Sequence, residues 1–484
     1  MSTEVTTSRP KNSIRVITAT SLFDGHDVST NIIRRILQDS GVEVIHLAHN
    51  RSVQELVDTA IEEDAQGIAM SSYQGGHMES FKYMIDLLRE KKASHIKVFG
   101  GGGGVIVADE IKELEAYGVT KIYSPEDGAA MGLQGMADHM ISLLDFSTLP
   151  FHNFDVNNLH STNEMVIAGF ITAVQQSKAG QATGLDGLIE SIKPLADKHN
   201  PPVIGITGTG GAGKSSLTDE IILRFLHDMQ DLTIAVICCD PSRRKTGGAL
   251  LGDRIRMNSI STSSRVYMRS LATRESSTEI SEALPEAIMV AKAADFDLII
   301  VETAGIGQGD SKITELADLS IYVMTSEFGA PSQLEKIDML DYADIIVVNK
   351  FEKKGSDDAI RDIRKQVQRN RKAFGTRPED FPVYGTIASK FNDDGVTALY
   401  HGIVEQLNSK KGCDLKPNIA KPALKTSSSK AIVIPPDRTR YLSEITEAIR
   451  KYHRQTEKQA DKVRRRWHLL ETADLLSQEE RENG

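Results

Sequence analysis

Residues 208–215 constrain the fold of this chain more than any other part of the sequence. They read Gly-Thr-Gly-Gly-Ala-Gly-Lys-Ser, after an apolar run at 203–206 and before a helix-like stretch from 217. In such a loop the glycines let backbone N–H groups turn toward phosphate oxygens, the lysine supplies a positive charge, and the serine hydroxyl can bind Mg²⁺. The alternative, a glycine-rich turn with a chance Gly-Lys-Ser, explains neither the strand before it nor the helix after it. We therefore predict a nucleoside triphosphate site formed by Gly208, Gly210, Gly211, Ala212, Gly213, Lys214 and Ser215, with Lys214 also catalytic.

A repeated alternation of short apolar runs with amphipathic stretches indicates an α/β chain with two parallel sheets. The first pattern, over residues 14–144, suits a flavodoxin-like, doubly wound domain whose ligands bind beyond the carboxyl ends of the strands. The second, over 201–412, contains the phosphate loop and predicts a P-loop nucleotide-binding domain. Strands of the first pattern are expected near 14–16, 42–47, 67–71, 96–99 and 121–123. The remaining segments are a polar tail at 1–13, a connector with one or two helices at 145–200, and a linker with a charged helix or helix pair at 413–484.

The composition is that of an ordinary globular protein. The formal net charge of -10 argues against nucleic acid as the main partner, although residues 462–466 form one basic patch that we interpret first as a solvated helix face. Two of the three cysteines, Cys238 and Cys239, are adjacent in an apolar strand, so neither a disulfide framework nor a zinc site is indicated. Residues 1–12 are polar and lack the apolar core of a signal peptide, and no run approaches the apolar length of a membrane span. We expect a cytoplasmic protein that binds neither nucleic acid nor membranes.

Carboxylates at the ends of two predicted strands are candidates for binding Mg²⁺. Asp240 follows the strand near 234–239, and Glu302 follows the strand at 298–301. Acidic side chains at such positions near a phosphate loop hold Mg²⁺ directly or through water. A glycine-marked loop at 247–257, expected to be mobile, adds Asp253 and Arg256, which can reach metal and phosphate. The alternatives are ordinary strand-end acids and a simple pair of Arg256 with Asp253 on one helix.

The residues after the strand at 344–348 indicate which base is bound. Guanine carries an N1–H and a 2-amino group, so the carboxylate of Glu352 can accept two hydrogen bonds that adenine cannot donate. Asn349 can meet the other edge of the base, and the stem of Lys350 can cover the ring. Ser389 and Lys390, in an Ala-Ser-Lys segment after the strand at 382–384, resemble the last base-contacting loop of G-proteins. The pattern predicts GTP rather than ATP, with Glu352 standing where G-proteins usually have Asp.

The whole set of motifs resembles the metallochaperone branch of GTPases that serves cobalamin-dependent acyl-CoA mutases. The resemblance rests on the phosphate loop, Asp-Pro-Ser at 240–242, the loop at 247–257, Glu-Thr-x-Gly-x-Gly-Gln at 302–308 and Asn-Lys at 349–350. It implies that Arg256 contacts the nucleotide and that Gln308 positions the attacking water. It also implies Mg²⁺ coordination by Ser215, Asp240, Asp253, Glu302 and Thr303, and a switch segment containing Gln333, Glu335 and Lys336.

Three loops of the first domain are expected to meet in one crevice. Asp-Gly-His-Asp at 24–27 follows the first strand, Ser-Ser-Tyr at 71–73 follows the third, and five glycines at 100–104 follow the fourth. A lone loop histidine is usually a polar surface residue, but Asp24 can accept a proton from the His26 nitrogen that is not used for a metal, as ligating histidines require. The glycines leave one wall without side chains, so that a large ligand can approach the backbone, although a flexible loop is the simpler interpretation.

This arrangement resembles the cobalamin-binding domain in which an Asp-x-His motif donates a histidine to cobalt. The resemblance implies His26 as the lower axial ligand, Asp24 as its hydrogen-bond partner, and Ser71, Gly101 and Gly102 beside the nucleotide tail of the cofactor. Two positions depart from the family pattern, since Ser29 stands where Gly is frequent and Tyr73 where Leu is frequent. A receiver domain shares this fold, but it needs a phospho-acceptor Asp where this chain has Ser71.

The two domains together resemble the amino-terminal part of fused isobutyryl-CoA mutases. The resemblance implies adenosylcobalamin, GTP and Mg²⁺ as cofactors, GTP hydrolysis, and a radical rearrangement of an acyl-CoA that needs a barrel absent from residues 1–484. We therefore expect a GTPase that acts with an acyl-CoA-binding mutase subunit or domain and forms a homo-oligomer. Alternatives from other classes are a GTPase metallochaperone for another metal, such as nickel, and a cobalamin-binding sensor or methyl carrier.

Overall fold

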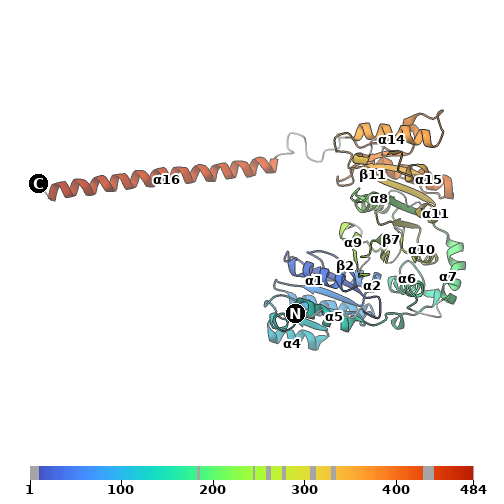
Figure 1. Cartoon of the computed structure of the whole chain (residues 1–484), viewed down its shortest axis with the longest axis horizontal. Coiled ribbons are helices and arrows are strands. Elements are labelled where there is room, and N and C mark those ends of the chain that lie inside the picture. The colour runs from blue at the N-terminus through green and yellow to red at the C-terminus, as the bar shows by residue number, and fades with distance from the viewer. Residues whose placement is uncertain are drawn as a thin grey trace, which may run out of the picture. The chain divides into compact units, whose positions relative to one another are not determined.

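The computed structural model describes residues 10–181, 186–243, 246–257, 263–274, 280–305, 312–328, 334–428 and 441–482. The chain forms two units, Met1–Ser427 and Ser428–Gly484. The first unit contains both sheets, and the second contains one long helix (Figure 1). Among the described residues, no helix is both long enough and apolar enough to cross a bilayer.

The first sheet has six parallel strands in the order β5-β4-β3-β1-β2-β8. Its first five strands confirm the expected ones and give the strand order of a flavodoxin-like fold. Buried side chains of α2, α3 and α4 cover one face, and those of α1 and α5 cover the other. The strands are β1 Arg15–Thr20, β2 Glu43–His46, β3 Gly67–Ser71, β4 Lys97–Gly101, β5 Lys121–Tyr123 and β8 Ala249–Leu251; the helices are α1 Val28–Asp39, α2 Val53–Glu62, α3 His77–Glu90, α4 Ala108–Tyr117 and α5 Pro125–Leu144.

Strand β8 comes from the loop at 247–257, which the glycines had marked as mobile. The loop instead adds a parallel strand to the edge of the first sheet, where Glu43 is in register with Ala249 and Ile45 with Leu251. The two α/β patterns of the sequence are therefore joined by a shared sheet edge. No local pattern marks this pairing, because its partner lies about two hundred residues earlier in the chain.

The second sheet has seven parallel strands in the order β13-β12-β11-β6-β10-β7-β9. Its central strands are buried along their whole length and rich in Val and Ile, as expected of a parallel sheet with helices on both faces. The strands are β6 Val203–Gly208, β7 Ile234–Asp240, β9 Val266–Ala272, β10 Leu298–Glu302, β11 Leu319–Thr325, β12 Ile345–Asn349 and β13 Val383–Thr386. The helices in this part of the chain are α8 Lys214–Asp228, α9 Asp253–Arg256, α10 Leu284–Ala293, α11 Ile313–Leu316, α13 Met339–Tyr342, α14 Ser356–Asn370 and α15 Asp394–Lys411.

The connector contains two helices, α6 Glu164–Lys178 and α7 Asp186–His199, as the sequence predicted. Both pack against α10, and their apolar side chains belong to the core on one face of the second sheet. Helix α6 also packs against α2 of the first domain. The connector is therefore part of the packed core between the sheets, while the domain boundaries drawn at 144, 200 and 412 stay predictions.

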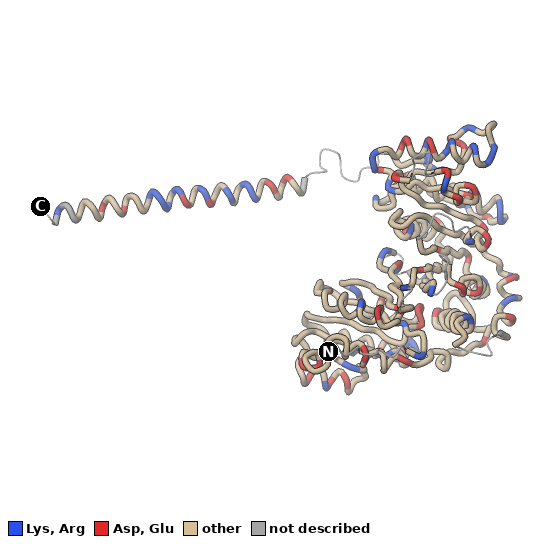
Figure 2. The backbone as a smooth tube through the Cα atoms, in the orientation of Figure 1, with Lys and Arg blue, Asp and Glu red and all other residues tan. Residues whose placement is uncertain are grey.

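Residues 441–482 form a single helix, α16 Tyr441–Glu482, so the single-helix alternative is the one observed. Basic residues dominate its middle part, over 450–466, and acidic residues lie toward both of its ends (Figure 2). Its larger apolar side chains, among them Ile449, Trp467 and Leu470, are exposed within its own unit.

Candidate functional sites

The phosphate loop joins the end of β6 to the first turn of α8. Gly208, Gly211 and Gly213 have φ values of 147°, 73° and 87°, a region that favours glycine. At Gly208 an added Cβ would lie 1.9 Å from the carbonyl oxygen of Val323, so close packing also requires glycine there. Lys214 is the first residue of α8, and its Nζ donates to the Gly208 carbonyl at 3.1 Å. The loop thus has the strand-loop-helix setting expected of a phosphate-binding site.

The candidate Mg²⁺ ligands gather around the hydroxyl of Ser215. Its Oγ lies 2.7 Å from Glu302 Oε1 and 3.1 Å from Asp253 Oδ1, and it accepts a hydrogen bond from Arg256 Nε at 3.0 Å. Arg256 also forms an ion pair with Asp253 on the same turn of helix, as the simpler alternative anticipated. Asp240 is buried nearby and accepts a hydrogen bond from the amide of Gly252 at 3.1 Å. The structure therefore brings Ser215, Asp240, Asp253 and Glu302 into one region.

The electrostatics of this region suit a cation. Burial, together with repulsion from Asp253, raises the pKa of Glu302 to about 7 and the pKa of Asp240 well above its ordinary value. Among the described residues, no three His, Cys, Asp or Glu side chains are placed so that they could hold a metal ion by themselves. Mg²⁺ usually takes one or two carboxylates together with water and nucleotide phosphates, so an incomplete protein shell fits this ion. Thr303, in contrast, uses its hydroxyl to donate to Thr207 at 2.8 Å.

Thr218 belongs to the same cluster and was missed by the sequence analysis. Its hydroxyl donates to Glu302 Oε2 at 2.8 Å, so it fixes the carboxylate that also contacts Ser215. Its position one helical turn after Lys214 and Ser215 is the available signal, because residues three and four apart on a helix face the same way.

Asn349 connects the phosphate loop to the segment expected to contact the base. Its Nδ2 donates to the carbonyl of Ala212 at 2.8 Å, and its Oδ1 accepts from Thr386 Oγ1 at 3.0 Å and from the amide of Ala388 at 3.1 Å. The buried Asn349 therefore acts as a brace between the two loops. Of the other predicted base contacts, Glu352 and Ser389 are exposed, while Lys350 and Lys390 are half-buried.

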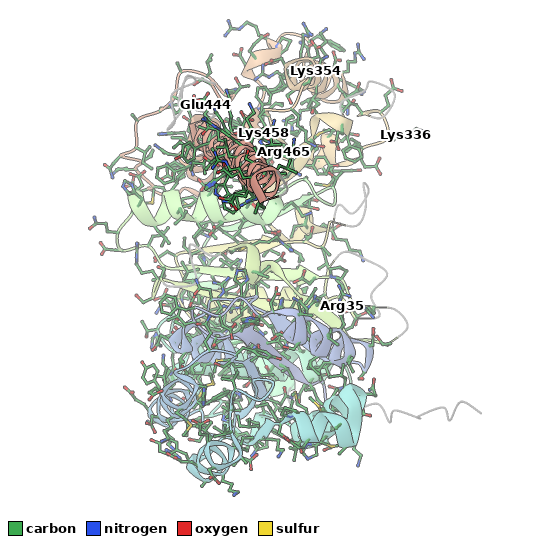
Figure 3. The ribbon with its side chains drawn as sticks, turned by 90° about the vertical axis from the view of Figure 1, so that its left-hand side faces the viewer. Arg35, Lys336, Lys354, Glu444, Lys458 and Arg465 are labelled. Atoms are coloured by element: carbon green, nitrogen blue, oxygen red, sulfur yellow. The ribbon has the colours of Figure 1, made fainter. Side chains whose placement is uncertain are left out.

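The predicted switch and water-positioning residues are only partly covered by the structure. Gln308 and Gln333 lie outside the described residues. Glu335 and Lys336 are exposed, and Lys336 extends from the surface (Figure 3). Their roles stay predictions.

In the first domain, Asp24 and His26 form the expected pair. Asp24 is buried, and its Oδ1 lies 2.7 Å from His26 Nδ1, whereas the His26 side chain is 68% exposed. The other carboxylate oxygen, Oδ2, accepts a hydrogen bond from the amide of Tyr73 at 2.6 Å. With Nδ1 engaged, Nε2 is the nitrogen left to serve as a ligand.

A groove of about 250 Å³ lies beside this pair, at the carboxyl ends of β1, β3 and β4. Phe99, Met136 and Met140 contribute apolar side chains to its lining, and Ser71 contributes a hydroxyl that is 2.8 Å from Thr30 Oγ1. Gly101 also lines the groove, as the sequence analysis expected. The groove is thus largely apolar with a few polar groups near its mouth, as in many cofactor sites.

The glycines at the end of β4 and directly after it are required for different reasons. An added Cβ at Gly102 would lie 2.2 Å from the carbonyl oxygen of Ser72, and at Gly100 it would lie 2.4 Å from side chains of Ile122 and Phe81. At Gly101 the nearest atom is 3.7 Å away, an ordinary contact. Packing therefore explains Gly100 and Gly102, and Gly101 is the position where a side chain would enter the groove.

Tyr73, which departs from the family pattern, is a second residue at the groove mouth. Its hydroxyl donates to Ser29 Oγ at 3.2 Å, which is the other departing position, and its ring lies 5.5 Å from the His26 ring. The two residues that depart from the family pattern, Tyr73 and Ser29, therefore contact each other and connect the loop after β3 to helix α1.

The fold and the two sites define a P-loop GTPase joined to a cobalamin-binding domain. The family described as methylmalonyl Co-A mutase-associated GTPase MeaB matches residues 167–481, and the B12 binding domain family matches residues 14–131. The chain belongs to the MeaB family of mutase-associated GTPases. Cobalamin, GTP and Mg²⁺ are accordingly its cofactors.

Relatives at high identity carry the name fused isobutyryl-CoA mutase, which confirms the resemblance drawn from the sequence. The protein from Geobacillus kaustophilus is 56% identical over 465 residues, covering 95% of this chain and 42% of its own length. The protein from Cupriavidus metallidurans is 57% identical over 470 residues, covering 96% of this chain and 42% of its own length. This chain thus spans less than half the length of these two relatives. Among solved structures, a LAO/AO transport system kinase matches at 21% identity and a TM-score of 0.38, over 53% of this chain and 75% of that one.

Proposed function

We propose that this chain carries adenosylcobalamin and acts as the GTP-hydrolysing chaperone of an acyl-CoA carbon-skeleton mutase. The observation that carries the proposal is the Asp24–His26 pair, which contacts Tyr73 in the lining of the apolar groove and lies in the same compact unit as the phosphate loop. The names of its relatives support an isobutyryl-CoA mutase reaction, whose product by carbon-skeleton rearrangement would be the linear isomer n-butyryl-CoA. The acyl-CoA-binding barrel is then a domain or subunit beyond residues 1–484.

The residues of the first domain suit the lower face and tail of the cofactor. His26 Nε2 would bind cobalt, Asp24 would keep Nδ1 protonated, and Ser71 and Gly101 would lie along the nucleotide tail in the groove. When bound, adenosylcobalamin supplies an organic radical by homolysis of its cobalt–carbon bond. The chain's own contribution is to hold the cofactor by the histidine and to bury its tail.

The residues of the second domain suit the binding and hydrolysis of GTP. Lys214 and the backbone of the phosphate loop would neutralise the phosphates, and Ser215 with Asp240, Asp253 and Glu302 would hold Mg²⁺ directly or through water. Arg256, which pairs with Asp253 and donates to Ser215, would contact a phosphate oxygen of the bound nucleotide. Asn349 and Glu352 would recognise guanine.

The test is the visible spectrum of the purified chain with adenosylcobalamin. We expect a base-off, histidine-on spectrum that is lost in His26→Ala and kept in His160→Ala, which changes an exposed histidine outside the groove. Absence of cobalamin binding by the unmodified chain would refute the assignment of the first domain. A second experiment adds GTP and a separately produced acyl-CoA-binding barrel. Lack of mutase turnover there would refute the proposal that such a barrel is the partner of this chain.

We also infer a homo-oligomer in the cytoplasm. The three cysteines are unpaired thiols, which supports a reducing compartment. Exposed apolar side chains on α16, such as Ile449 and Trp467, support association through this helix. Sedimentation of the full chain tests the oligomer, and a monomeric mass at micromolar concentration would contradict it.

A further inference from the structure

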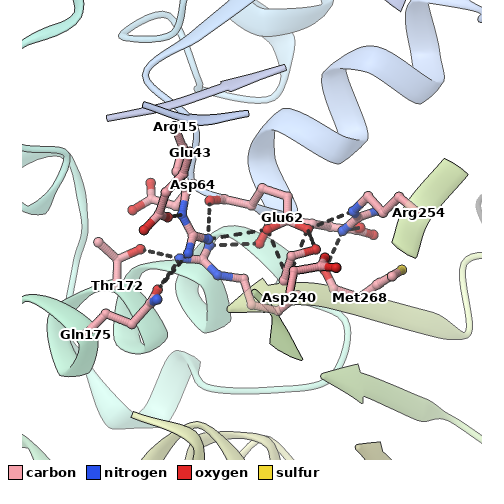
Figure 4. A network of polar contacts seen from close by, with 12 residues as sticks. Arg15, Glu43, Glu62, Asp64, Thr172, Gln175, Asp240, Arg254 and Met268 are labelled. Atoms are coloured by element: carbon pink, nitrogen blue, oxygen red, sulfur yellow. Dashed lines mark hydrogen bonds and ion pairs between the residues drawn. The ribbon is translucent and has the colours of Figure 1, made fainter. Parts of the chain in front are cut away.

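Charged side chains are buried at several places in the first unit, and a buried charge needs hydrogen-bond partners. One group lies between the two α/β domains, where Arg254 pairs with Glu62 (Figure 4). Another is Asp393, which is completely buried directly before helix α15. Of these buried charges, Asp393 lies nearest in the chain to the segment 387–390, which contains two of the predicted base contacts.

Three hydrogen bonds meet at one oxygen of Asp393. Its Oδ2 accepts from the amide of Ile387 at 3.1 Å, from the amide of Val396 at 3.0 Å and from the hydroxyl of Ser427 at 2.7 Å. The other oxygen, Oδ1, has no hydrogen-bond partner among the described residues. The bond from Val396 caps helix α15, and the bond from Ile387 fixes the first residue of the segment 387–390. One carboxylate therefore holds both the helix and the segment with the predicted base contacts.

Ser427 belongs to a short strap, the segment 425–427, which the sequence analysis assigned to a linker. The strap forms an isolated parallel bridge with β13, in which Thr426 is paired with Gly385. The amide of Gly385 donates to the carbonyl of Lys425, and the amide of Ser427 donates to the carbonyl of Gly385, both at 2.9 Å. The strap thus lies along β13, the strand that leads directly into the segment 387–390.

Lys425 fixes the other end of the strap. Its Nζ donates to three successive backbone carbonyls just before β13, at 3.0, 2.9 and 2.9 Å, those of Glu379, Asp380 and Phe381. The strap is therefore held at both ends, by Lys425 at the start of β13 and by Ser427 beside the segment that follows β13.

The segment 387–390 also contacts Asn349. The amide of Ala388 donates to Asn349 Oδ1, so the segment lies beside the residue that is expected to meet the edge of guanine away from Glu352. Guanine has an acceptor oxygen, O6, where adenine has an amino group. Backbone N–H groups of the segment can select O6 only if the segment keeps its position, because hydrogen bonds weaken steeply with distance and angle. A support that fixes Ile387 is therefore also a support for the choice of base.

We propose that Ser427, acting through Asp393, positions the segment 387–390 and so increases the preference for guanine over adenine. Both are positioning residues, since they act through the segment. The proposal rests on the proposed function, because it assumes that Asn349 and this segment recognise guanine. In the simpler interpretation Ser427 and Asp393 only cap α15 and cover the edge of the sheet. Ser427→Ala would then lower the free energy of unfolding and leave the relative affinities for nucleotides unchanged.

The experiment compares nucleotide binding by the full chain and by Ser427→Ala, through competition against a fluorescent GDP that is first titrated with each protein. The competitors are GTP, ATP, inosine triphosphate, which keeps O6 but lacks the 2-amino group, and 2-aminopurine riboside triphosphate, which keeps the 2-amino group but lacks O6. We expect Ser427→Ala to weaken GTP and inosine triphosphate by the same factor, roughly tenfold, the usual effect of losing a hydrogen bond to a charged group. The two compounds without O6 should bind as they do to the unmodified chain.

The matched control is Ser320→Ala. Ser320 Oγ also donates to a carboxylate, Asp344 Oδ2 at 3.0 Å, but this pair lies at the amino ends of β11 and β12. Ligands of such sheets bind beyond the carboxyl ends of the strands, so Ser320→Ala should keep all four affinities of the unmodified chain. Urea unfolding of both variants measures how much stability each one loses.

Hydrogen exchange of the unmodified chain adds a measurement that needs no variant. If a bound guanine holds the segment 387–390 in place, the segment must in turn stabilise the strap. We therefore expect saturating GDP, and not saturating ADP, to slow the exchange of the amides of Gly385 and Ser427. This measurement decides the matter if Ser427→Ala does not fold.

The outcomes separate the two proposals. Equal affinities of the unmodified chain for GTP and ATP would overturn the proposed recognition of guanine, and the role of the strap with it. In a chain that prefers GTP, an unchanged ratio of GTP to ATP affinity in Ser427→Ala, an equal loss for all competitors, or the same change in Ser320→Ala would overturn the role of the strap alone. Exchange at Gly385 and Ser427 that does not respond to GDP would do the same.

Discussion

The buried carboxylate of Asp24 lies 2.7 Å from Nδ1 of the exposed His26 and fixes how that ring is presented. Burial opposes ionisation, but amide hydrogen bonds from Tyr73 and His26 together with the His26 ring hold the pKa of Asp24 below its ordinary value. Asp24 is therefore charged at neutral pH and favours a proton on Nδ1. The lone pair of Nε2 is then the one available to a metal.

Asp24→Asn is predicted to weaken cobalamin binding by roughly 10- to 100-fold, the usual effect of changing the partner of a ligating histidine. The side-chain oxygen of the new asparagine can still accept a hydrogen bond from His26 Nδ1. Asparagine lacks the second, charged oxygen that accepts the hydrogen bond from the amide of Tyr73. Spectral titration measures the affinity. Asp27→Asn, in the same loop, is the matched control, and equal weakening in both variants would contradict a specific role for Asp24.

Gly101→Val is predicted to block the groove without harming the fold. Its Cβ would meet only the carbonyl of Tyr123 at 3.7 Å, and valine suits a strand. Cobalamin affinity should fall by at least an order of magnitude, while the free energy of unfolding changes by no more than about 0.5 kcal/mol. Spectral titration and urea unfolding measure the two quantities.

Gly102→Ala provides the contrasting case. Its Cβ would lie 2.2 Å from a backbone oxygen, so a shift of the chain is required and the fold should lose about 1–3 kcal/mol. If Gly101→Val destabilised the protein as much as Gly102→Ala, the loss of cobalamin would report misfolding rather than a blocked groove.

The features that could be predicted from the sequence are local. The phosphate loop is complete within eight residues, and Asp24 reaches His26 across a single residue, so each motif contains its own geometry. Five of the six strands of the first sheet were also recovered, because each is a short apolar run.

The contacts between the domains could not be predicted in the same way. Strand β9 was missed because Arg269 interrupts its apolar run, and this arginine is completely buried. Glu62 and Glu63 have the pattern of a solvated helix end, but their partner Arg254 lies about 190 residues further along the chain. Buried charges of this kind depend on tertiary partners that no local window contains.

Glu352→Ala is predicted to lower the preference for guanine. Two charge-assisted hydrogen bonds to the base would be lost, which corresponds to roughly 1.5–3 kcal/mol, or about 10- to 100-fold in GDP affinity. Binding of ATP should not change, because adenine cannot donate these bonds. Competition of GTP and ATP against a fluorescent GDP measures the ratio.

Asp357→Ala serves as the control for that experiment, since Asp357 is an exposed carboxylate in the first turn of α14. It should leave the ratio of GTP to ATP affinity as in the unmodified chain. An unchanged ratio of GTP to ATP affinity in Glu352→Ala would show that other residues recognise the base. Asn349 would be the next candidate, because it already joins the two loops.

Glu43 makes the contact between the two α/β domains sensitive to acid. Its buried carboxylate accepts from Arg15 Nε at 2.8 Å and from Arg274 Nε at 3.0 Å. Burial by itself raises the pKa of Glu43, but the positive charges of Arg274 and Arg15 outweigh this effect and lower the pKa to about 2. Because the folded pKa lies below the unfolded value, the stabilisation is complete above the unfolded pKa and is lost as the pH falls toward 2. The full contribution is about 3 kcal/mol, of which about 2 kcal/mol disappears between about pH 6 and pH 3.

Glu43→Gln should remove this part of the acid dependence, so its free energy of unfolding should fall by about 2 kcal/mol less than that of the unmodified chain over this interval. Urea unfolding at the two pH values measures the difference, and Glu90→Gln, an exposed glutamate of α3, should behave like the unmodified chain. Equal acid dependence in Glu43→Gln and the unmodified chain would show that Glu43 is not held ionised by Arg15 and Arg274.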